Sequence, residues 1–349
     1  MNPAMQRLNV LDLLRGVASL AVCWFHLTNG NENFLPQGWL RASGAYGWLG
    51  VNVFFVISGF IIPYSLFQGG YRLGDYGRFL LKRVLRLDPP YIAAIALIVG
   101  LGFLTSHMPG FRGQPFQVSA MQLLVHLGYA NVLLGYPWLS PVFWTLAIEL
   151  QYYLLVGLLF PLLISKRIAV RTITFVCLAV FAFLIPGRPF VFHWLFLFML
   201  GIATFQFRKG DLSRAAYWIH WALLTVGACY MDGVVVGLAG AATALVIAFV
   251  NAKPGKPWIF FGLISYSLYL IHVPIGGRVI NLAERLPRTL MIELLALATG
   301  LALSIFTAWL FYKWIERPAQ RWSAAIGYRQ KLPAPSGFAP RRLPGGQRF

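Results

Sequence analysis

Charged residues are scarce in this chain. Only 11% of its 349 residues are Asp, Glu, Lys or Arg, whereas a soluble domain carries about a quarter. Hydrophobic residues make up 58%, and they recur in runs near twenty residues long without the alternation of strands. The composition therefore excludes a soluble enzyme and predicts an all-α polytopic membrane protein, because only helices and closed barrels satisfy backbone hydrogen bonds in lipid.

Cysteine is also rare, and this excludes two further classes of site. Cys23, Cys177 and Cys229 lie in apolar stretches and are not paired at metal-ligand spacing. We expect neither a disulfide framework nor a zinc site, and no permanently bound cofactor. No small-residue cleavage site follows the first apolar run, so we expect that run to be a retained span and not a removed signal peptide.

Acidic residues are outnumbered 10 to 29 by basic ones, which gives a net charge of +19. Such a charge is typical of nucleic-acid binding, but here the basic residues fall mainly in short loops and in the tail. That placement follows the positive-inside rule of membrane proteins. We therefore expect contact with anionic membrane lipids and no nucleic-acid partner.

The apolar segments predict a topology. If the short segment 119–134 does not cross the membrane, the basic loops all fall on one side, so we predict about ten transmembrane helices and cytoplasmic termini. Segment 119–134 is then a re-entrant or interfacial helix. The predicted spans are 10–28, 46–67, 89–105, 141–164, 172–186, 190–207, 215–231, 234–250, 258–279 and 289–312.

The chain divides into two parts by composition. Residues 1–316 form a single transmembrane domain without a convincing internal repeat. Residues 317–349 hold seven Lys or Arg, no acid, and several Pro and Gly. We expect this basic segment to be a disordered cytoplasmic tail near the lipid surface.

Two ionisable residues stand in the first apolar run, and such residues in hydrocarbon usually have a function. Arg15 and His26 are eleven positions apart, almost three helical turns, so both project from nearly the same face. The rise between them is about 16 Å, half the thickness of a bilayer core. We expect both side chains to line one water-filled passage through the protein. Alternatively, Asp12 merely neutralises Arg15 and His26 is an interfacial histidine.

Two other groups of polar residues are candidates for chemistry. Lys82, Arg83 and Arg86 precede the third span and suit phosphate groups, or they only anchor the helix at the cytoplasmic surface. Glu149 is the single acid of 141–164. It lies about 12 Å from the outer end of that span, so it must be protonated or paired, and a structural salt bridge is the alternative.

The remaining candidates have strong structural alternatives. Ser58 beside Gly59 allows close helix packing more readily than it suggests a nucleophile. Tyr266, Tyr269 and His272 recur at a spacing of three, which suits a packed helix face as well as a site. In the predicted topology His26, Glu149 and His272 lie toward the outside. Arg15, Arg83 and Arg86 lie toward the inside, so anion-binding and acid/base groups are separated.

The motifs, taken in order, resemble the membrane acyltransferase-3 family, whose members O-acylate carbohydrates and some other molecules. The similarity extends from about Leu8 to Arg321. Two positions depart from it, since many relatives have an acid where this chain has Asn52 and another where it has Leu150. The matching stretches are Leu11-Asp12 with Arg15 and His26, FFVISGF, Lys82-Arg83 with Arg86, FWTLAIE ending at Glu149, ISYSLYLIHVP, and IERP.

The resemblance implies a membrane O-acyltransferase of a bacterial inner membrane. Its donor would be cytoplasmic acyl-CoA, in particular acetyl-CoA, because acetyl is the frequent acyl group in the family. Its acceptor would be a hydroxyl of a glycan or glycoside. His26 would be the general base and Glu149 would orient it or the acceptor. Arg15, Lys82, Arg83 and Arg86 would hold the donor. Candidates for substrate binding are Asn52, Ser58, Trp144, Tyr269 and His272.

A rival interpretation comes from another class of protein. Ten spans with interior His, Glu and Arg also suit a proton-coupled transporter or a lipid-linked sugar flippase. Transporters of that kind tend to have pseudo-symmetric halves and paired broken helices, and the sequence has neither. Release of free CoA by the purified protein in detergent separates the two interpretations, since transport needs a sealed compartment.

Overall fold

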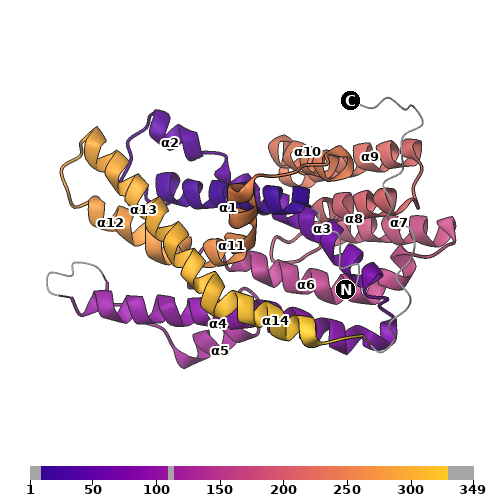
Figure 1. The fold of residues 1–349 in the computed structure, drawn as a ribbon, viewed down its shortest axis with the longest axis horizontal. Coiled ribbons are helices and arrows are strands. Elements are labelled where there is room, and N and C mark those ends of the chain that lie inside the picture. Colours follow the sequence, from indigo (N-terminus) through magenta and orange to yellow (C-terminus); the bar gives the residue numbers. More distant parts are fainter. Residues whose placement is uncertain (1–8, 109–113, 329–349) are drawn as a thin grey trace.

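The computed structural model describes residues 9–108 and 114–328, and every regular element in these ranges is helical. The helices form an elongated bundle in which most run along the long axis (Figure 1). Six are long and apolar enough to cross a membrane, which confirms a polytopic all-α protein. These six candidate spans are Asn9–Asn29, Trp39–Gln68, Leu73–Ser106, Trp144–Leu163, Lys256–Ala283 and Leu290–Ala325.

The candidate spans contain the helices α1 (Asn9–Asn29), α2 (Trp39–Gly44), α3 (Gly50–Gln68), α4 (Tyr76–Ser106), α6 (Trp144–Leu163), α11 (Lys256–His272), α12 (Arg278–Ala283), α13 (Leu290–Phe311) and α14 (Arg317–Ala325). One π-helical turn, Val273–Gly277, joins α11 to α12, and another, Tyr312–Glu316, joins α13 to α14. Such turns inside longer helices are often found at functional sites.

The other helices are shorter or less apolar, so the predicted number of ten spans stays a prediction. Each of the ten predicted segments contains an α-helix, but those between α6 and α11 do not reach the length and hydropathy of the six. These helices gather at the right of Figure 1. They are α7 (Ile168–Leu184), α8 (Leu195–Lys209), α9 (Arg214–Asp232) and α10 (Val234–Phe249).

Segment 119–134 holds one short helix, α5 (Ala120–Leu127). Eight residues rise only about 12 Å, which is too little to cross a hydrocarbon core of about 30 Å. The helix begins at Ser119, whose hydroxyl accepts from the Gln122 amide at 3.0 Å. The chain then folds back, and the buried His126 ring accepts a hydrogen bond from the Leu139 amide at 3.0 Å.

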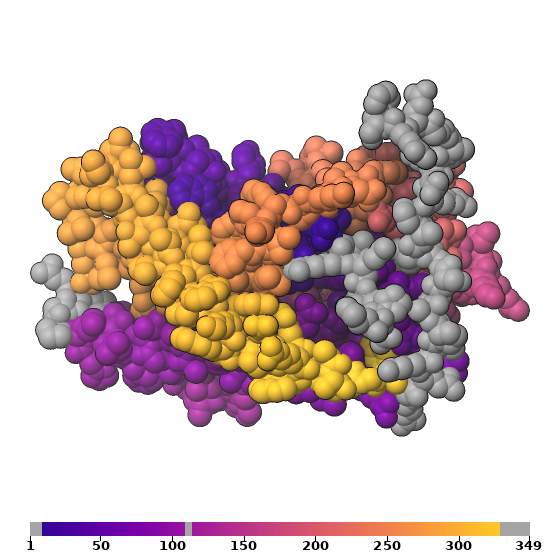
Figure 2. Space-filling model, viewed as in Figure 1, coloured from indigo at the N-terminus to yellow at the C-terminus, as the bar shows by residue number. Residues whose placement is uncertain are grey.

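The chain stays ordered beyond 316, which corrects part of the expected disordered tail. Helix α14 packs along α4 (Figure 2). The Ser323 hydroxyl donates to the Lys82 carbonyl at 2.7 Å, and Lys82 Nζ donates to the Ile326 carbonyl at 2.7 Å. Pro318 stands in the first turn of α14, where a helix does not need its missing N–H. Residues 329–349 of the expected tail lie outside the described residues.

Helices α3 and α8 approach closely because glycine stands on both sides of their contact. A Cβ atom at Gly201 would lie 2.2 Å from the Val56 carbonyl oxygen, and one at Gly59 would lie 2.1 Å from the Phe198 carbonyl oxygen. Neither contact is possible without moving a backbone. Small residues serve the same purpose at other membrane helix contacts.

This contact gives a prediction about stability. Gly201→Ala should lower the apparent melting temperature of the detergent-solubilised protein, because overpacking a tight contact costs about 1–3 kcal/mol. Gly100→Ala on α4 is the matched control, since nothing lies within 4 Å of its Cβ position. The control should melt at or above the temperature of the parent chain. Equal melting of both variants would contradict the assigned contact.

Candidate functional site

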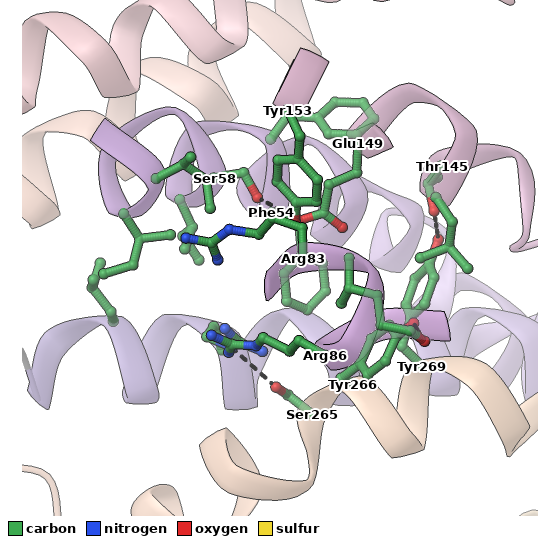
Figure 3. Close-up of a pocket in the computed structure, with 18 of the residues that line it drawn as sticks. Phe54, Ser58, Arg83, Arg86, Thr145, Glu149, Tyr153, Ser265, Tyr266 and Tyr269 are labelled. Carbon is green, nitrogen blue, oxygen red and sulfur yellow. Dashed lines mark hydrogen bonds between the residues drawn. The ribbon is translucent and has the colours of Figure 1, made fainter. Parts of the chain in front are cut away.

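A cavity of about 470 Å³ lies among α1, α3, α4, α6, α11 and the π-helical turn Tyr312–Glu316. It is long, since its wall follows α3 from Val51 to Ser65, a rise of about 21 Å. Figure 3 shows side chains from several helices converging on it. Its polar wall residues are Asp12, Arg15, Ser58, Tyr64, Ser65, Arg83, Arg86, Thr145, Glu149, Tyr153, Ser265, Tyr266, Tyr269 and Glu316.

Arg15 enters this cavity because α1 and α11 cross closely. A Cβ atom at Gly262 would lie 2.5 Å from the Asp12 carbonyl oxygen, so only glycine allows this approach. Arg15 Nε then donates to the Ser265 hydroxyl at 3.2 Å. Within the described residues this neutral hydroxyl is the hydrogen-bond partner of the guanidinium, which has five N–H donors in all.

Arginines gather at one end of the cavity, beside Ser65. Arg83 is only 7% exposed, and its Nη2 donates to the Ser65 hydroxyl at 3.2 Å. Its Nε has no partner among the described residues. Arg86 lies one helical turn further along α4 and also faces the cavity (Figure 3). Buried guanidinium donors without partners suit an anion, and phosphate is the anion that arginine binds bidentately.

A hydrogen-bonded carboxylate lies in the middle of the cavity. Glu149 Oε1 accepts from the Ser58 hydroxyl at 3.1 Å and from the Tyr153 hydroxyl (Figure 3). Tyr153 is not among the residues expected from the sequence, although a residue four positions after Glu149 faces the same side of a helix. The Arg83 guanidinium lies over the Tyr153 ring, 5.5 Å from its centroid.

A second carboxylate was also missed. Glu316 was not among the candidate site residues, but it is 2% exposed and stands in the cavity wall. Its Oε2 accepts from the Ser267 amide at 3.1 Å and hydroxyl at 2.5 Å, and its Oε1 accepts from Gln320 at 2.9 Å. These contacts join α11 to the helix that follows α13 across about fifty residues of sequence.

Tyr269 closes the cavity at the end opposite the arginines. Its hydroxyl shares a hydrogen bond of 2.7 Å with Thr145 Oγ1 and donates to the Val142 carbonyl at 3.2 Å. Phe54 packs edge-on against the Tyr269 ring with a centroid distance of 5.8 Å. Along α3, therefore, Ser65, Ser58 and Phe54 contact Arg83, Glu149 and Tyr269 in turn.

His26 and His272 form a pair outside the cavity wall. His272 Nδ1 lies 2.8 Å from the Leu268 carbonyl and must donate to it, so Nε2 is the acceptor in the neutral ring. His26 Nδ1 lies 3.2 Å from that Nε2 and 2.9 Å from the Val22 carbonyl, so it carries the proton. The network thereby assigns a free lone pair to His26 Nε2. Within the described residues this atom has no hydrogen-bond partner.

Arg15 and His26 both contact α11, through Ser265 and His272, as their eleven-residue spacing predicts. The passage between them is not continuous in this structure. Ser19 and Val22 lie between the two on α1, and both are buried, at 0% and 1% exposed. The cavity ends at Tyr269, one turn before His272.

Three other candidate residues lie outside the cavity wall. Lys82 Nζ bonds the Ile326 carbonyl, since it points about 100° around the helix from Arg83. Asn52 is 2% exposed, and its Oδ1 has no hydrogen-bond partner among the described residues. Trp144 contacts Phe55 edge-on and Trp194 at a tilt. Within the described ranges, three or more His, Cys, Asp or Glu side chains nowhere gather in a way that would hold a metal ion.

Two relatives are similar in sequence. One bears the provisional name membrane-bound transacylase BcsY, from Komagataeibacter xylinus, and is 28% identical over 297 residues, covering 76% of this chain and 72% of the relative. The other is provisionally named acetyltransferase ORF330, from Acidianus two-tailed virus. It is 30% identical over 148 residues, which is 42% of this chain and 39% of the viral protein. No solved structure matches the chain significantly.

The family comparison covers far more of the chain than the viral relative does. A model of the acyltransferase domain matches residues 8–313, a range that includes all the residues of the cavity wall except Glu316. The apolar helices agree with this match, because they make the chain an integral membrane protein. The chain therefore belongs to the acyltransferase-3 family.

Proposed function

We propose that this protein transfers an acyl group, in the simplest case acetyl, from cytoplasmic acyl-CoA to a hydroxyl of a glycan or glycoside. The observation that carries the proposal is the polarity of the cavity. Guanidinium groups lie at one end, and the other end stops one helical turn from a histidine pair. A donor with charged phosphates, a long neutral arm and a reactive thioester matches this order.

The arginines would bind the phosphates of the donor. Arg83 and Arg86 share one face of α4, and Arg15 reaches the same cavity from α1. Glu149 and Glu316 accept from neutral donors, so the guanidinium groups keep N–H groups for a ligand. The pantetheine arm, which joins the phosphates of acyl-CoA to its thioester, would follow α3 from Ser65 toward Phe54. Apolar side chains of α3 line part of this path.

His26 would act as the general base. Its Nε2 carries the free lone pair, because the bonds to Val22 and His272 hold the proton on Nδ1. As the acceptor oxygen attacks the thioester carbonyl, the hydroxyl proton moves to His26 Nε2. The new C–O bond forms, the C–S bond breaks, and the CoA thiolate leaves and takes up a proton. Glu149 would orient the acyl end of the donor through Ser58 and Tyr153.

The proposal includes a location and an orientation. The basic loops favour cytoplasmic termini in a bacterial inner membrane, so the arginine end of the cavity faces the cytoplasm. Acyl-CoA is present on that side. The acceptor would approach from the outer side, where His26 lies in the predicted topology.

Two measurements together test the proposal. The purified protein in detergent should release free CoA thiol from acetyl-CoA when cell-surface glycans are added, and mass spectrometry should find matching acetyl groups on those glycans. A transporter or flippase would release no thiol, because transport needs sealed compartments. Glycans that are equally acetylated in cells with and without the protein would refute the glycan acceptor.

A further inference from the structure

Tyr269 stands between the cavity and the histidine pair. Its ring lies in the cavity wall, and its centroid is 6.2 Å from that of His272 on the next turn of α11. Neither His26 nor His272 lines the cavity, and His272 is fully buried. Tyr269 is therefore a residue of the cavity wall whose ring also contacts the histidine pair.

The contacts that hold Tyr269 come from two other helices. Thr145 and the Val142 carbonyl, at the start of α6, bond its hydroxyl, and Phe54 of α3 packs against its ring. Tyr269 is 6% exposed, and within the described part of the chain its hydroxyl is bonded by one other hydroxyl and one carbonyl. A rotation about the side-chain bonds of Tyr269 breaks these two hydrogen bonds and no backbone hydrogen bond of α11.

We infer that Tyr269 is a gate between the donor cavity and His26, closed by its hydrogen bond to Thr145. This inference rests on the proposed function, because it concerns access of the donor thioester to the base. The closed ring keeps the thioester away from His26 and from water on the outer side. Movement of the ring joins the two spaces, so that acyl transfer follows acceptor arrival. Closing elements of this kind protect reactive groups from hydrolysis.

The test measures hydrolysis of acetyl-CoA by purified protein in detergent, without any acceptor. In that reaction water adds to the thioester carbonyl, the C–S bond breaks, and CoA leaves as a thiol beside acetate. Tyr269→Ala should raise the hydrolysis rate at least about tenfold over the parent chain, because His26 can then activate water at the thioester. Thr145→Ala removes the hydrogen bond to the Tyr269 hydroxyl and should raise the hydrolysis rate by a smaller factor. This variant replaces Tyr269→Ala in the test if Tyr269→Ala does not fold.

Two controls separate a gate from a general loosening. Trp258→Ala removes an aromatic side chain from the same helix at a position that is 40% exposed and lies outside the cavity wall, and it should leave hydrolysis at the parent rate. The double variant Tyr269→Ala/His26→Ala should lose the added hydrolysis. Radiolabelled acetyl-CoA should bind to the four variants and to the parent chain with similar affinity.

Each outcome decides between the claims. A rise that depends on His26 and is confined to Tyr269 and Thr145 supports the gate. Unchanged hydrolysis in a folded Tyr269→Ala protein that binds acetyl-CoA overturns the gate alone, and so does a rise that persists without His26. Failure of the parent chain to bind acetyl-CoA overturns the proposed function, and the gate with it.

Discussion

His26→Ala should lower kcat for acyl transfer by about 10²–10⁴-fold, the usual contribution of a general base. The structure explains why no neighbour replaces it. His272 is fully buried, and its two ring nitrogens are engaged by the Leu268 carbonyl and by His26. Binding of acetyl-CoA should be retained, because His26 lies outside the donor cavity. The measurement is initial-rate transfer at saturating donor together with binding of labelled acetyl-CoA.

His107→Ala is the matched control for this variant. His107 is exposed at the end of α4, and its ring Nδ1 bonds the Phe103 carbonyl four residues before it. Its loss should leave kcat unchanged. A His26→Ala protein that melts like the parent chain and keeps full transfer would remove His26 from the chemistry.

Arg83→Ala combined with Arg86→Ala should raise the KM for acetyl-CoA by about 10–100-fold with a small change in kcat. Hydrogen bonds to charged groups contribute about 1.5–3 kcal/mol, and 1.4 kcal/mol is a tenfold change in affinity. Phosphates far from the reacting bond are held equally in the ground and transition states, so KM changes and kcat does not. Steady-state kinetics with varied acetyl-CoA measures both constants.

Arg78→Ala supplies the control on the same helix. Arg78 is exposed and lies outside the cavity wall, and its Nη1 donates a long 3.5 Å bond to the Gly327 carbonyl. It should leave the donor KM unchanged. If the double variant has the KM of the parent chain, Arg83 and Arg86 do not bind the donor phosphates.

Much of the fold follows from the sequence because helix formation in membranes is governed by local hydrophobicity. Each predicted span contains a helix. The helix in segment 119–134 is too short to cross the membrane. The C-terminal prediction fails between Arg317 and Ala325 for a physical reason. That segment is polar in composition, but Ser323 bonds the α4 backbone and the Ile326 carbonyl accepts from Lys82, and these contacts are invisible in composition.

The sequence predicts a site residue where spacing along one helix determines whether its side chain reaches the cavity. It does not predict one where packing between helices determines this. The three-residue spacing of Arg83 and Arg86 places both in the cavity, whereas Lys82, one residue earlier, points elsewhere. Tyr153 could have been found, because it stands four residues after Glu149. Glu316 could not, since its partner Ser267 lies on another helix and the pairing depends on how α11 and α13 pack.

A structure of this protein determined with acetyl-CoA bound would test the central claim most directly. We predict that its phosphates lie against Arg83 and Arg86, that its arm follows α3 past Ser58, and that its thioester ends beside Tyr269. Acetyl-CoA bound outside this cavity, or bound with its nucleotide at the tyrosine end, would contradict the account.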